Sequence, residues 1–222
     1  MIILGGMVDT YKHRGMRKSL VRIIQQKGIN NPAVLRAIGT VPRHVFIDEI
    51  FVEHAYQDKA FPIGEGQTIS QPYTVAFQSD LLEVKAGDSV LEIGTGSGYQ
   101  ACVLCEMGIQ LYTIEYQRKL YEKARVMLPK MGYTPRFFHG DGSLGLPQFA
   151  PYDAIIVTAG APTIPSSLIK QLKSGGRLVI PVGDAKSQKM VKLTKVNEKQ
   201  VKKEEFDRFS FVPLLGEQGW NN

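Results

Sequence analysis

The sequence predicts an open, doubly wound α/β fold whose sheet is mainly parallel. From residue 88 onward, short apolar runs typical of strands alternate with longer stretches typical of helices. Connections of this length indicate right-handed crossovers between parallel strands. A glycine-rich turn follows the first apolar run, and an acidic residue stands in or just after each of the first three. Because such sheets bind ligands at the carboxyl ends of their strands, the pattern also predicts a binding crevice.

The first third of the chain is predicted to be a helical extension. Gly28 can end a first amphipathic helix, and Asn31 and Pro32 supply an N-cap and a first helical position for a second. The stretch 61–72 is rich in glycine, proline and polar residues, so we expect a functional loop there. The helices expected in this part span residues 17–27, 32–41 and 73–82.

The alternating part is predicted to contain five strands joined by helices. The strands are expected at residues 89–93, 110–115, 136–139, 153–158 and 177–181. The helices are expected from the glycine turn to residue 107, at 118–127 (before Pro129), and at 165–172 (before Gly175 and Gly176). Residues 189–212 should add antiparallel strands at one edge, as in many mixed sheets.

The composition is that of an ordinary globular protein. The chain has 222 residues, of which 43% are hydrophobic and 22% are charged. This length suits one domain, which we expect over residues 1–222. The sequence shows neither a bilayer-spanning apolar run nor a secretory leader pattern. We therefore expect a cytoplasmic protein with no membrane partner.

The net charge of +6 leaves a nucleic-acid partner open. Seven lysines gather between residues 186 and 203, and several of them alternate with apolar residues. We interpret this segment as the solvated face of an edge hairpin, where lysine discourages aggregation. A nucleic-acid groove is the alternative, but the segment lacks interleaved aromatic residues that would stack on bases.

The two cysteines, Cys102 and Cys105, form a C-x-x-C pattern. Two thiolates without a paired histidine cluster cannot complete a structural zinc site. They lie in an apolar stretch typical of a buried helix face, so we expect inert thiols and no metal.

The glycine turn at residues 94–98 indicates a cofactor site. Its glycines let the chain bend tightly and let a ligand approach the backbone of Gly94, Thr95 and Gly96. Glu115 ends the next strand, 21 positions after Gly94, where an acidic side chain accepts hydrogen bonds from ribose hydroxyls. Glu92 lies two positions before the turn and could help to hold an ammonium group, directly or through water.

The spacing of this turn separates two kinds of cofactor. Dinucleotide sites use G-x-G-x-x-G and place a pyrophosphate on the helix N-terminus. This turn has the pattern G-x-G-x-G after an acid, which suits S-adenosylmethionine, a molecule with an ammonium, a carboxylate and no phosphate. Asp141 and Gly142 follow the third strand, where Asp141 could accept a hydrogen bond from the adenine amine. We therefore expect S-adenosylmethionine as cofactor and S-adenosylhomocysteine as product.

The acceptor of the methyl group is indicated by what the sequence lacks. Methylation of nucleobase amines usually calls for an Asn/Asp-Pro-Pro-aromatic loop after the fourth strand, and this chain has Thr-Ala-Gly-Ala-Pro at 158–162. Neither cysteine is placed to attack cytosine, and we find no ligand cluster for metal-dependent catechol chemistry. A carboxylate needs none of these because it is ionised at neutral pH. The pattern therefore favours carboxyl methylation.

Motifs along nearly the whole chain are similar to those of the protein-L-isoaspartate O-methyltransferase family. They span residues 41–46, 55–58, 62–72, 91–99, 140–142, 150–162, 172–183 and 212–216. Many methyltransferases share the glycine turn, whereas the segment Gly66-Gln-Thr-Ile-Ser70 is much more specific to this family. One departure is Ser174, which stands where a proline often precedes two glycines and concerns a turn away from the chemistry.

The resemblance implies a Rossmann-like class I S-adenosylmethionine methyltransferase fold. It implies methylation of the free α-carboxylate of L-isoaspartyl residues in damaged proteins and peptides, which initiates repair through a succinimide. Ser70 corresponds to the family's active-site serine, which orients that carboxylate, and Thr68 and Ile69 line the space between substrate and methyl donor. The residues expected to cover the site and bind substrate are Val212, Leu214 and Leu215.

We therefore expect residues 1–85 to form the helical extension and substrate loop, 86–183 the cofactor-binding core, and 184–222 the edge strands and C-terminal substrate segment. The expected partners are isoaspartyl-containing proteins and peptides, with no nucleic acid, and the expected state is a monomer.

Alternatives remain at this stage. Ser70 could simply cap the helix that begins near Tyr73. The chain could be an NAD-dependent oxidoreductase or a basic nucleic-acid-binding module. Neither of these two functions explains the three acids and the loop around Ser70 together.

Overall fold

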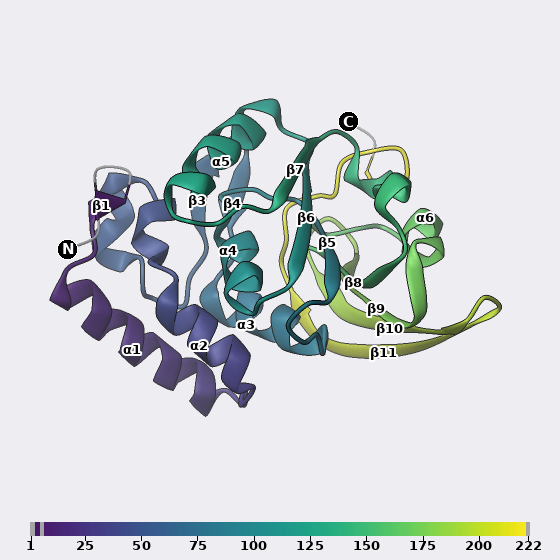
Figure 1. Cartoon of the computed structure of the whole chain (residues 1–222), viewed down its shortest axis with the longest axis horizontal. Helices are drawn as coiled ribbons and strands as arrows, with labels where there is room; N and C mark the ends of the chain where they lie inside the picture. The colour runs from purple at the N-terminus through teal and green to yellow at the C-terminus, as the bar shows by residue number, and fades with distance from the viewer. Residues whose placement is uncertain (1–2, 5–6, 221–222) are drawn as a thin grey trace.

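A single mixed sheet organises the chain (Figure 1). The computed structural model describes residues 3–4 and 7–220. The seven strands of the sheet run in the order β11-β10-β9-β8-β5-β6-β7, parallel from β9 to β7 and antiparallel at β10 and β11. They are β5 (Ser89–Ile93), β6 (Gln110–Glu115), β7 (Arg136–His139), β8 (Tyr152–Val157), β9 (Leu172–Gly183), β10 (Gln188–Asn197) and β11 (Gln200–Phe209). The predicted fold class is confirmed.

Helices cover both faces of this sheet. Figure 1 shows α4 (Tyr99–Glu106) and α5 (Arg118–Lys130) on the same side as the N-terminal helices, with α6 (Ser166–Lys170) on the other side. The N-terminal helices are α1 (Tyr11–Gln26), α2 (Pro32–Thr40) and α3 (Pro72–Leu81). The shorter elements are β1 (Ile3–Leu4), β2 (Met7–Val8), η1 (Arg43–Phe46), η2 (Glu49–His54), β3 (Phe61–Gly64), β4 (Gln67–Ile69), η3 (Gly142–Leu144) and η4 (Pro147–Phe149).

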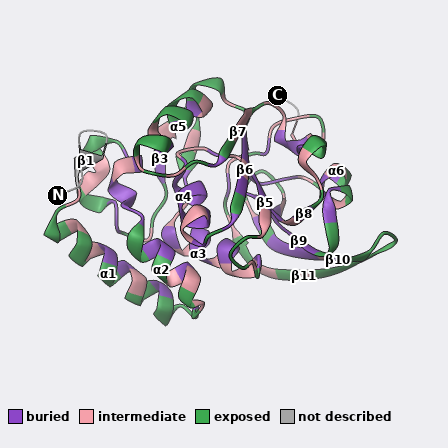
Figure 2. Cartoon of the chain, viewed as in Figure 1, coloured by how far each residue is buried: buried purple, intermediate pink, exposed green. Residues whose placement is uncertain are grey.

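The two faces of the sheet have separate apolar clusters. Val90 on β5 belongs to the larger cluster, which includes residues of α1 to α5. Leu91 and Ile93, which alternate with it, belong to the cluster beside α6. Figure 2 shows the central strands as buried. Since β5 is packed from both sides, the position of its carboxyl end is closely determined.

Strand β9 begins earlier than the sequence indicated. It starts at Leu172 instead of Arg177, and α6 accordingly ends at Lys170. The pairing of β8 with β9 is irregular between the pairs Tyr152–Leu172 and Ala154–Arg177. Gly175 has a φ of +79° in this interval. The glycines therefore shape a bulge within the strand and do not separate a helix from it.

Two helix boundaries also differ from the prediction. Helix α1 begins at Tyr11, because Thr10 and His13 form a reciprocal capping box. Helix α5 continues through Pro129 to Lys130. Pro129 falls in the last turn, so its missing N–H removes one hydrogen bond at the end of the helix and the helix stops one residue later.

The segment expected to be a functional loop contains a β-hairpin. Strands β3 and β4 pair antiparallel, and Glu65 and Gly66 connect them with φ angles of 51° and 68°. Two consecutive positive φ angles are typical of the tight turns that join hairpin strands. The expectation of a loop across 61–72 was therefore wrong in this part, whereas residues 70 and 71 lie outside regular structure before α3.

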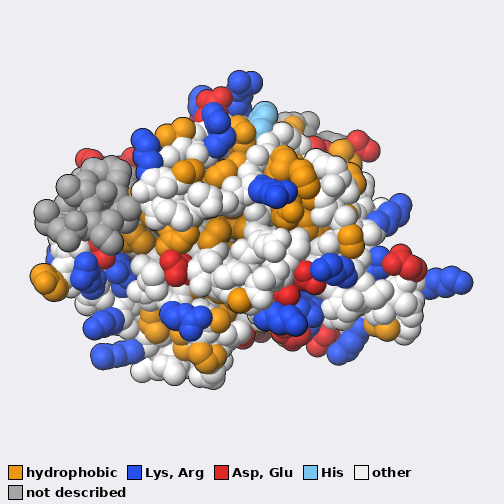
Figure 3. All heavy atoms as spheres, viewed as in Figure 1, with side chains coloured by type: hydrophobic (Ala, Val, Ile, Leu, Met, Phe, Trp, Pro, Cys, Tyr) orange, Lys and Arg blue, Asp and Glu red, His pale blue; other side chains and the backbone are white. Residues whose placement is uncertain are grey.

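The lysine-rich segment forms the predicted antiparallel strands, but its lysines are not all solvated. Lys192 and Lys195 are buried, because β10 lies between β9 and β11 instead of at the edge. Lys192 pairs with Glu83 at 2.7 Å, and Lys195 donates to the carbonyl of Leu172 at 3.0 Å. On the face in Figure 3, acidic and basic side chains are interspersed.

Arg43 connects the N-terminal helices to the segment that leads into the β3–β4 hairpin. It is fully buried, and it donates to the carbonyls of Ala55 and Lys59, just before β3. Its guanidinium also lies 4.8 Å from the ring centroid of Tyr99. The side chain of Arg43 thus fixes the backbone that leads into β3.

We predict that Arg43→Met lowers the free energy of unfolding by about 1–3 kcal/mol, because two carbonyls lose their donor. Urea unfolding curves measure this change. Arg36→Met is the matched control, since Arg36 is exposed on α2. Equal losses in the two variants would contradict the role assigned to Arg43.

Candidate active site

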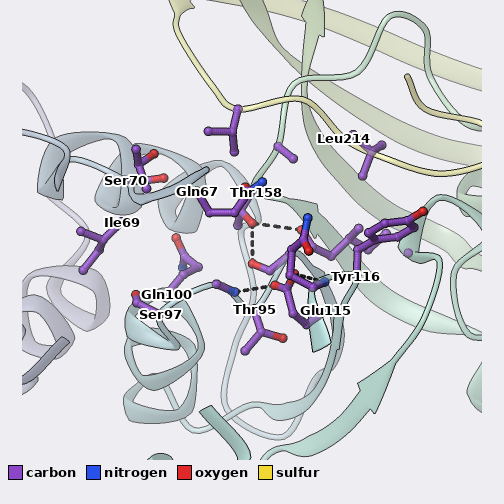
Figure 4. Close-up of a pocket in the computed structure, with 18 of the residues that line it drawn as sticks. Gln67, Ile69, Ser70, Thr95, Ser97, Gln100, Glu115, Tyr116, Thr158 and Leu214 are labelled. Carbon is purple, nitrogen blue, oxygen red and sulfur yellow. Dashed lines mark hydrogen bonds between the residues drawn. The ribbon is translucent and has the colours of Figure 1, made fainter. Parts of the chain in front are cut away.

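A cleft of about 760 Å³, including its solvent-open part, lies at the carboxyl ends of β5, β6 and β8. It is formed by the turn after β5, the hairpin β3–β4 and the segment after β11 (Figure 4). The predicted site residues that line it are Thr68, Ile69, Ser70, Gly94, Thr95, Gly96, Glu115, Gly142, Val212, Leu214 and Leu215. Glu92 and Asp141 are not among its lining residues. Most of the predicted site thus meets in one place.

Two glycines bring the backbone close to neighbouring elements at the cleft. Gly94 has a φ of +95°, and a Cβ there would lie 2.5 Å from Thr158 Oγ1. A Cβ on Gly142 would lie 2.5 Å from Ile93 Cγ2. A side chain at either position would therefore displace the wall of the cleft. The backbone itself lines this wall, as expected for a site that holds a nucleoside against the main chain.

Glu115 lies at the bottom of the cleft and is 5% exposed. Its Oε2 accepts from the backbone N–H of Gly96 at 2.7 Å, and its Oε1 accepts from that of Gln117 at 2.8 Å (Figure 4). Each carboxylate oxygen can accept a further hydrogen bond. The side chain therefore has acceptor positions for the two hydroxyls of a ribose.

Glu92 lies behind the cleft wall, fully buried. Its Oε2 accepts from Thr113 Oγ1 at 2.6 Å, and Thr113 in turn lies 2.5 Å from Thr95 Oγ1, which belongs to the wall. Its Oε1 has no hydrogen-bond partner. Burial raises the pKa of Glu92 to about 8. Glu92 can therefore act on an ammonium in the cleft through the hydrogen bonds of the two threonines. A direct contact would require these side chains to rearrange.

Asp141 lies between η3 and the C-terminal segment. Its Oδ1 accepts from the backbone N–H and the hydroxyl of Ser143, and its Oδ2 accepts from the backbone N–H of Glu217 at 2.7 Å. These contacts fasten residues 216–217 over the carboxyl end of β7. As a carboxylate oxygen, Oδ2 has the capacity to accept a second hydrogen bond.

Ser70 is not the N-cap of α3. The N-cap is Gln71, whose own side chain makes no capping hydrogen bond, and Asp58 Oδ1 instead accepts from the backbone N–H of Tyr73 in the first turn at 2.8 Å. Figure 4 shows Ser70 at the start of this helix, on the opposite side of the cleft from Glu115. The capping hypothesis for Ser70 is therefore wrong, and its hydroxyl is not engaged at the helix N-terminus.

The hairpin that carries Thr68 and Ile69 closes one side of the cleft. Lys119 at the start of α5 donates to Glu65 at the hairpin tip, with a distance of 2.9 Å. Ile63 on β3 lies close to Gly96. The hairpin therefore contacts both the glycine turn and the start of α5.

The segment after β11 closes the other side. The backbone N–H of Gly160 donates to the carbonyl of Val212, and that of Leu214 donates to the carbonyl of Gly160, both at 2.8 Å. Trp220 Nε1 also donates to the carbonyl of Gly160, at 2.9 Å. Gly160 thus holds Val212 and Leu214 against the cleft, as the resemblance implied.

An open groove adjoins the cleft at Ser70. The residues that line both spaces are Thr68, Ser70, Thr158 and Val212. The groove continues between α3 and the end of β11 and has a volume of about 1680 Å³, including solvent-open space. A ligand in the cleft and a second ligand in the groove would therefore meet beside Ser70.

Sequence reasoning missed several residues of the cleft. They are Gln67, Ser97, Gln100, Tyr116 and Thr158. Tyr116 and Thr158 each directly follow the carboxyl end of a parallel strand, which was a usable signal. Gln100 gave no such signal, because its place on the cleft depends on how α4 is rotated.

The histidines and cysteines do not form a second reactive centre. Cys102 is buried, and burial raises the pKa of Cys105 to about 12, as expected for inert thiols. Among residues 3–4 and 7–220, Asp9, His13 and His44 approach one another closely enough to be considered for a metal. Arg17 and Arg14 already bind the Asp9 carboxylate, so a cation would have to displace them.

Comparisons with known proteins agree with this geometry. Residues 15–219 match the family described as protein-L-isoaspartate(D-aspartate) O-methyltransferase. A protein-L-isoaspartate O-methyltransferase of Cytophaga hutchinsonii is 60% identical over 97% of both chains, and one of Christiangramia forsetii is 58% identical over 94% of this chain and 98% of the relative.

Two solved structures are similar over most of the chain. One is a protein-L-isoaspartate O-methyltransferase with a TM-score of 0.82 and 29% identity, over 91% of this chain and 67% of the other. The second, from Plasmodium falciparum, is described as an enzyme of the same kind in complex with S-adenosyl-L-homocysteine. Its TM-score is 0.76 at 26% identity, over 90% of this chain and 98% of the other.

The buried carboxyl of Glu92 predicts a pH dependence of stability. Its pKa is about 8 when folded and 4.5 when exposed. Between these values the unfolded chain has lost the proton that the folded chain keeps. This contribution to stability is therefore fully present below pH 4.5 and is lost as the pH rises through 8.

We predict that Glu92→Gln removes this decrease in the free energy of unfolding with rising pH, which is at most about 1.4 kcal/mol per pH unit. Unfolding free energies of the ligand-free protein across this pH range provide the measurement. Glu49→Gln, at an exposed position in η2, is the control and should keep the wild-type slope. The same slope in Glu92→Gln would refute the assignment.

Proposed function

Because the chain belongs to the protein-L-isoaspartate(D-aspartate) O-methyltransferase family, which methylates isoaspartyl residues with S-adenosylmethionine in protein repair, we propose how its residues bind both substrates. The chain is thus a carboxyl methyltransferase that acts on isoaspartyl-containing proteins and peptides. The observation that supports the proposal best is the junction at Ser70, where the cleft beside the glycine turn meets the groove beside α3.

We propose that the cleft holds S-adenosylmethionine through the residues that line it. Glu115 accepts from the ribose hydroxyls, and the backbone around Gly94, Thr95 and Gly96 lies against the methionine portion. Gly142 gives the adenine room, and Asp141 accepts from its amine through the remaining position on Oδ2. Gly94 and Gly142 both line the cleft beside Glu115, which supports this placement.

Glu92 acts indirectly in this proposal. Thr113 and Thr95 link its carboxyl to the cleft wall by short hydrogen bonds. When the ammonium of the cofactor lies near Thr95, its charge lowers the pKa of Glu92. An ionised Glu92 would then stabilise that charge through the polarised hydroxyls of the two threonines.

The acceptor is the α-carboxylate of an isoaspartyl residue, which enters from the groove. The cofactor supplies a methyl group on a positively charged sulfur. Ser70 donates a hydrogen bond to one carboxylate oxygen, and this contact aims the other oxygen at the methyl group. Thr68, Ile69 and the segment from Val212 to Leu215 exclude water from this path. No general base is needed, because a carboxylate is already ionised at neutral pH.

The products of this step are S-adenosylhomocysteine and a methyl ester, whose methoxy group leaves more readily than the oxygen of a free carboxylate. The neighbouring backbone nitrogen attacks the ester carbonyl and releases methanol to form a succinimide, which water opens to aspartate or isoaspartate. The enzyme therefore only has to activate the carboxyl group, and repair follows from the reactivity of the ester.

The remaining expectations extend this proposal. We propose a cytoplasmic monomer that acts without a nucleic acid. In the described part of the chain, no helix has both the length and the apolar character that crossing a membrane would require. We also propose that the N-terminal extension, core and C-terminal segment, divided at residues 85 and 183, form one domain.

The test of function is transfer of a labelled methyl group to two peptides that differ only in an Asp or isoAsp linkage. We expect a base-labile ester on the isoAsp peptide alone. Ser70→Ala should lower kcat on this peptide by about 10- to 100-fold, since the acceptor loses its orientation. Unchanged turnover would exclude the proposed role of Ser70. Labelling of both peptides would contradict the assignment of the isoaspartyl carboxylate as the acceptor.

We predict that Glu115→Ala weakens binding of S-adenosylhomocysteine by about 10- to 100-fold, because hydrogen bonds to a charged acceptor are lost. Calorimetric titration measures the affinity, and urea unfolding confirms that the variant is folded. The Ser70→Ala protein serves as the control and should bind with near wild-type affinity. Unaltered affinity in Glu115→Ala would exclude the ribose contact.

A further inference from the structure

The groove beside Ser70 has an uneven charge. The titratable and charged side chains that line it are Lys27, Tyr73, Lys186, Asp207 and Arg208. Three of these are cations and one is an anion at neutral pH. The groove opens to solvent and leads to the junction at Ser70, so a bound polypeptide would pass these charges on its way to the cleft.

The cations differ in whether they are already neutralised. Lys27 forms an ion pair with Asp58 at 2.5 Å and also lies over the ring of Tyr73. Lys186 and Arg208 have no carboxylate within 4 Å among the described residues. These two side chains are therefore the cations that remain available to a ligand.

Two anions, Asp207 and Asp184, lie near this pair, and in the described part of the chain neither comes within ion-pair distance of it. Backbone hydrogen bonds lower the pKa of Asp184, and the charges of Arg208 and Lys186 lower it further. Arg208 Nη1 donates to Ser187 Oγ at 3.3 Å, and Ser187 directly follows Lys186 in the chain. Burial raises the pKa of Tyr73, and the charge of Asp207 nearby raises it further. Asp184 accepts from the backbone N–H groups of Lys186 and Ser187 and is not part of the groove lining.

Apolar surface accompanies these charges. Phe209 and Phe211 line the groove at the end of β11, and Tyr73 lines it from α3. The ring of Tyr73 packs on Phe77, which in turn contacts Phe209. The groove thus combines an aromatic wall with a basic end, which suits a peptide segment better than an isolated small anion.

We propose that this groove binds the substrate chain next to the isoaspartyl residue and favours substrates that carry Asp or Glu there. The proposal rests on the proposed function, because it takes Ser70 as the point where the isoaspartyl carboxylate is held. Lys186 and Arg208 determine specificity and do not touch the reacting atoms. Their charge would act on the capture of substrate, so it should change kcat/KM through KM.

The test uses a panel of isoAsp peptides with Glu, Gln or Lys at each of the three positions on either side. We expect the order Glu, Gln, Lys in kcat/KM, with steps of about 3- to 10-fold, at positions on one side of the isoAsp. The difference should shrink as ionic strength approaches about 1 M, where the Debye length is ~3 Å.

Two variants connect the preference to the residues. Lys186→Gln/Arg208→Gln should bring the three peptides to similar values, and Lys186→Glu/Arg208→Glu should reverse their order. Lys199→Glu/Lys170→Glu is the matched control for Lys186→Glu/Arg208→Glu, because it changes the net charge by the same amount. Lys199 precedes β11 and is about 30 Å from Arg208 along the strand, and Lys170 lies on α6.

The outcomes separate the two proposals. Equal kcat/KM for the Glu, Gln and Lys peptides in the wild type would overturn the inference, provided that the Gln peptides are methylated. A preference that persists in Lys186→Glu/Arg208→Glu, or that vanishes equally in the control variant, would overturn it too. Failure to methylate any isoAsp peptide, including those with Gln, would contradict the proposed function itself.

Discussion

The buried carboxylate of Glu115 is the contact on which the geometry of the cleft depends. It accepts from the backbone of Gly96 in the turn after β5 and from the backbone of Gln117 at the start of α5. One side chain thereby ties the end of β6 to two helix-initiating turns. A buried carboxylate is costly unless it is hydrogen-bonded, so this arrangement specifies where the turns lie. The remaining acceptor positions are then directed into the cleft.

The substrate side is assembled on this core from the two ends of the described chain. Arg43 holds the chain that enters β3, and the hairpin reaches α5 through Glu65 and Lys119. From the other end, Val212 and Leu214 pair with Gly160, and Asp141 holds the backbone of Glu217. The core supplies the fixed anchors, and segments far apart in the sequence complete the wall. This division suits an enzyme that needs a fixed cofactor and an acceptor from a flexible polypeptide.

The correct and incorrect predictions differ in the range of the interactions behind them. Strands β5, β6 and β7 match the expected residues, because short apolar runs between clear turns determine them locally. The early start of β9 depends on pairing with β8 around a bulge. Lys192 and Lys195 are buried on a strand that pairs with β9 on one side and with β11 on the other. These outcomes required contacts that a local pattern does not encode.

The sequence by itself determined the fold class, the position of the glycine turn and the residue types at the strand ends. The spacing of that turn also indicated the cofactor, and the resemblance to a family then indicated the isoaspartyl acceptor and the importance of Ser70. Only the tertiary structure decided that Glu115 lines the cleft, that Glu92 lies behind it, and that Asp141 holds the C-terminal segment. It also decided that Lys186 and Arg208 share a groove with Ser70. Periodicity assigns a side chain to a face of its element, but burial and partners come from elements that are distant in sequence.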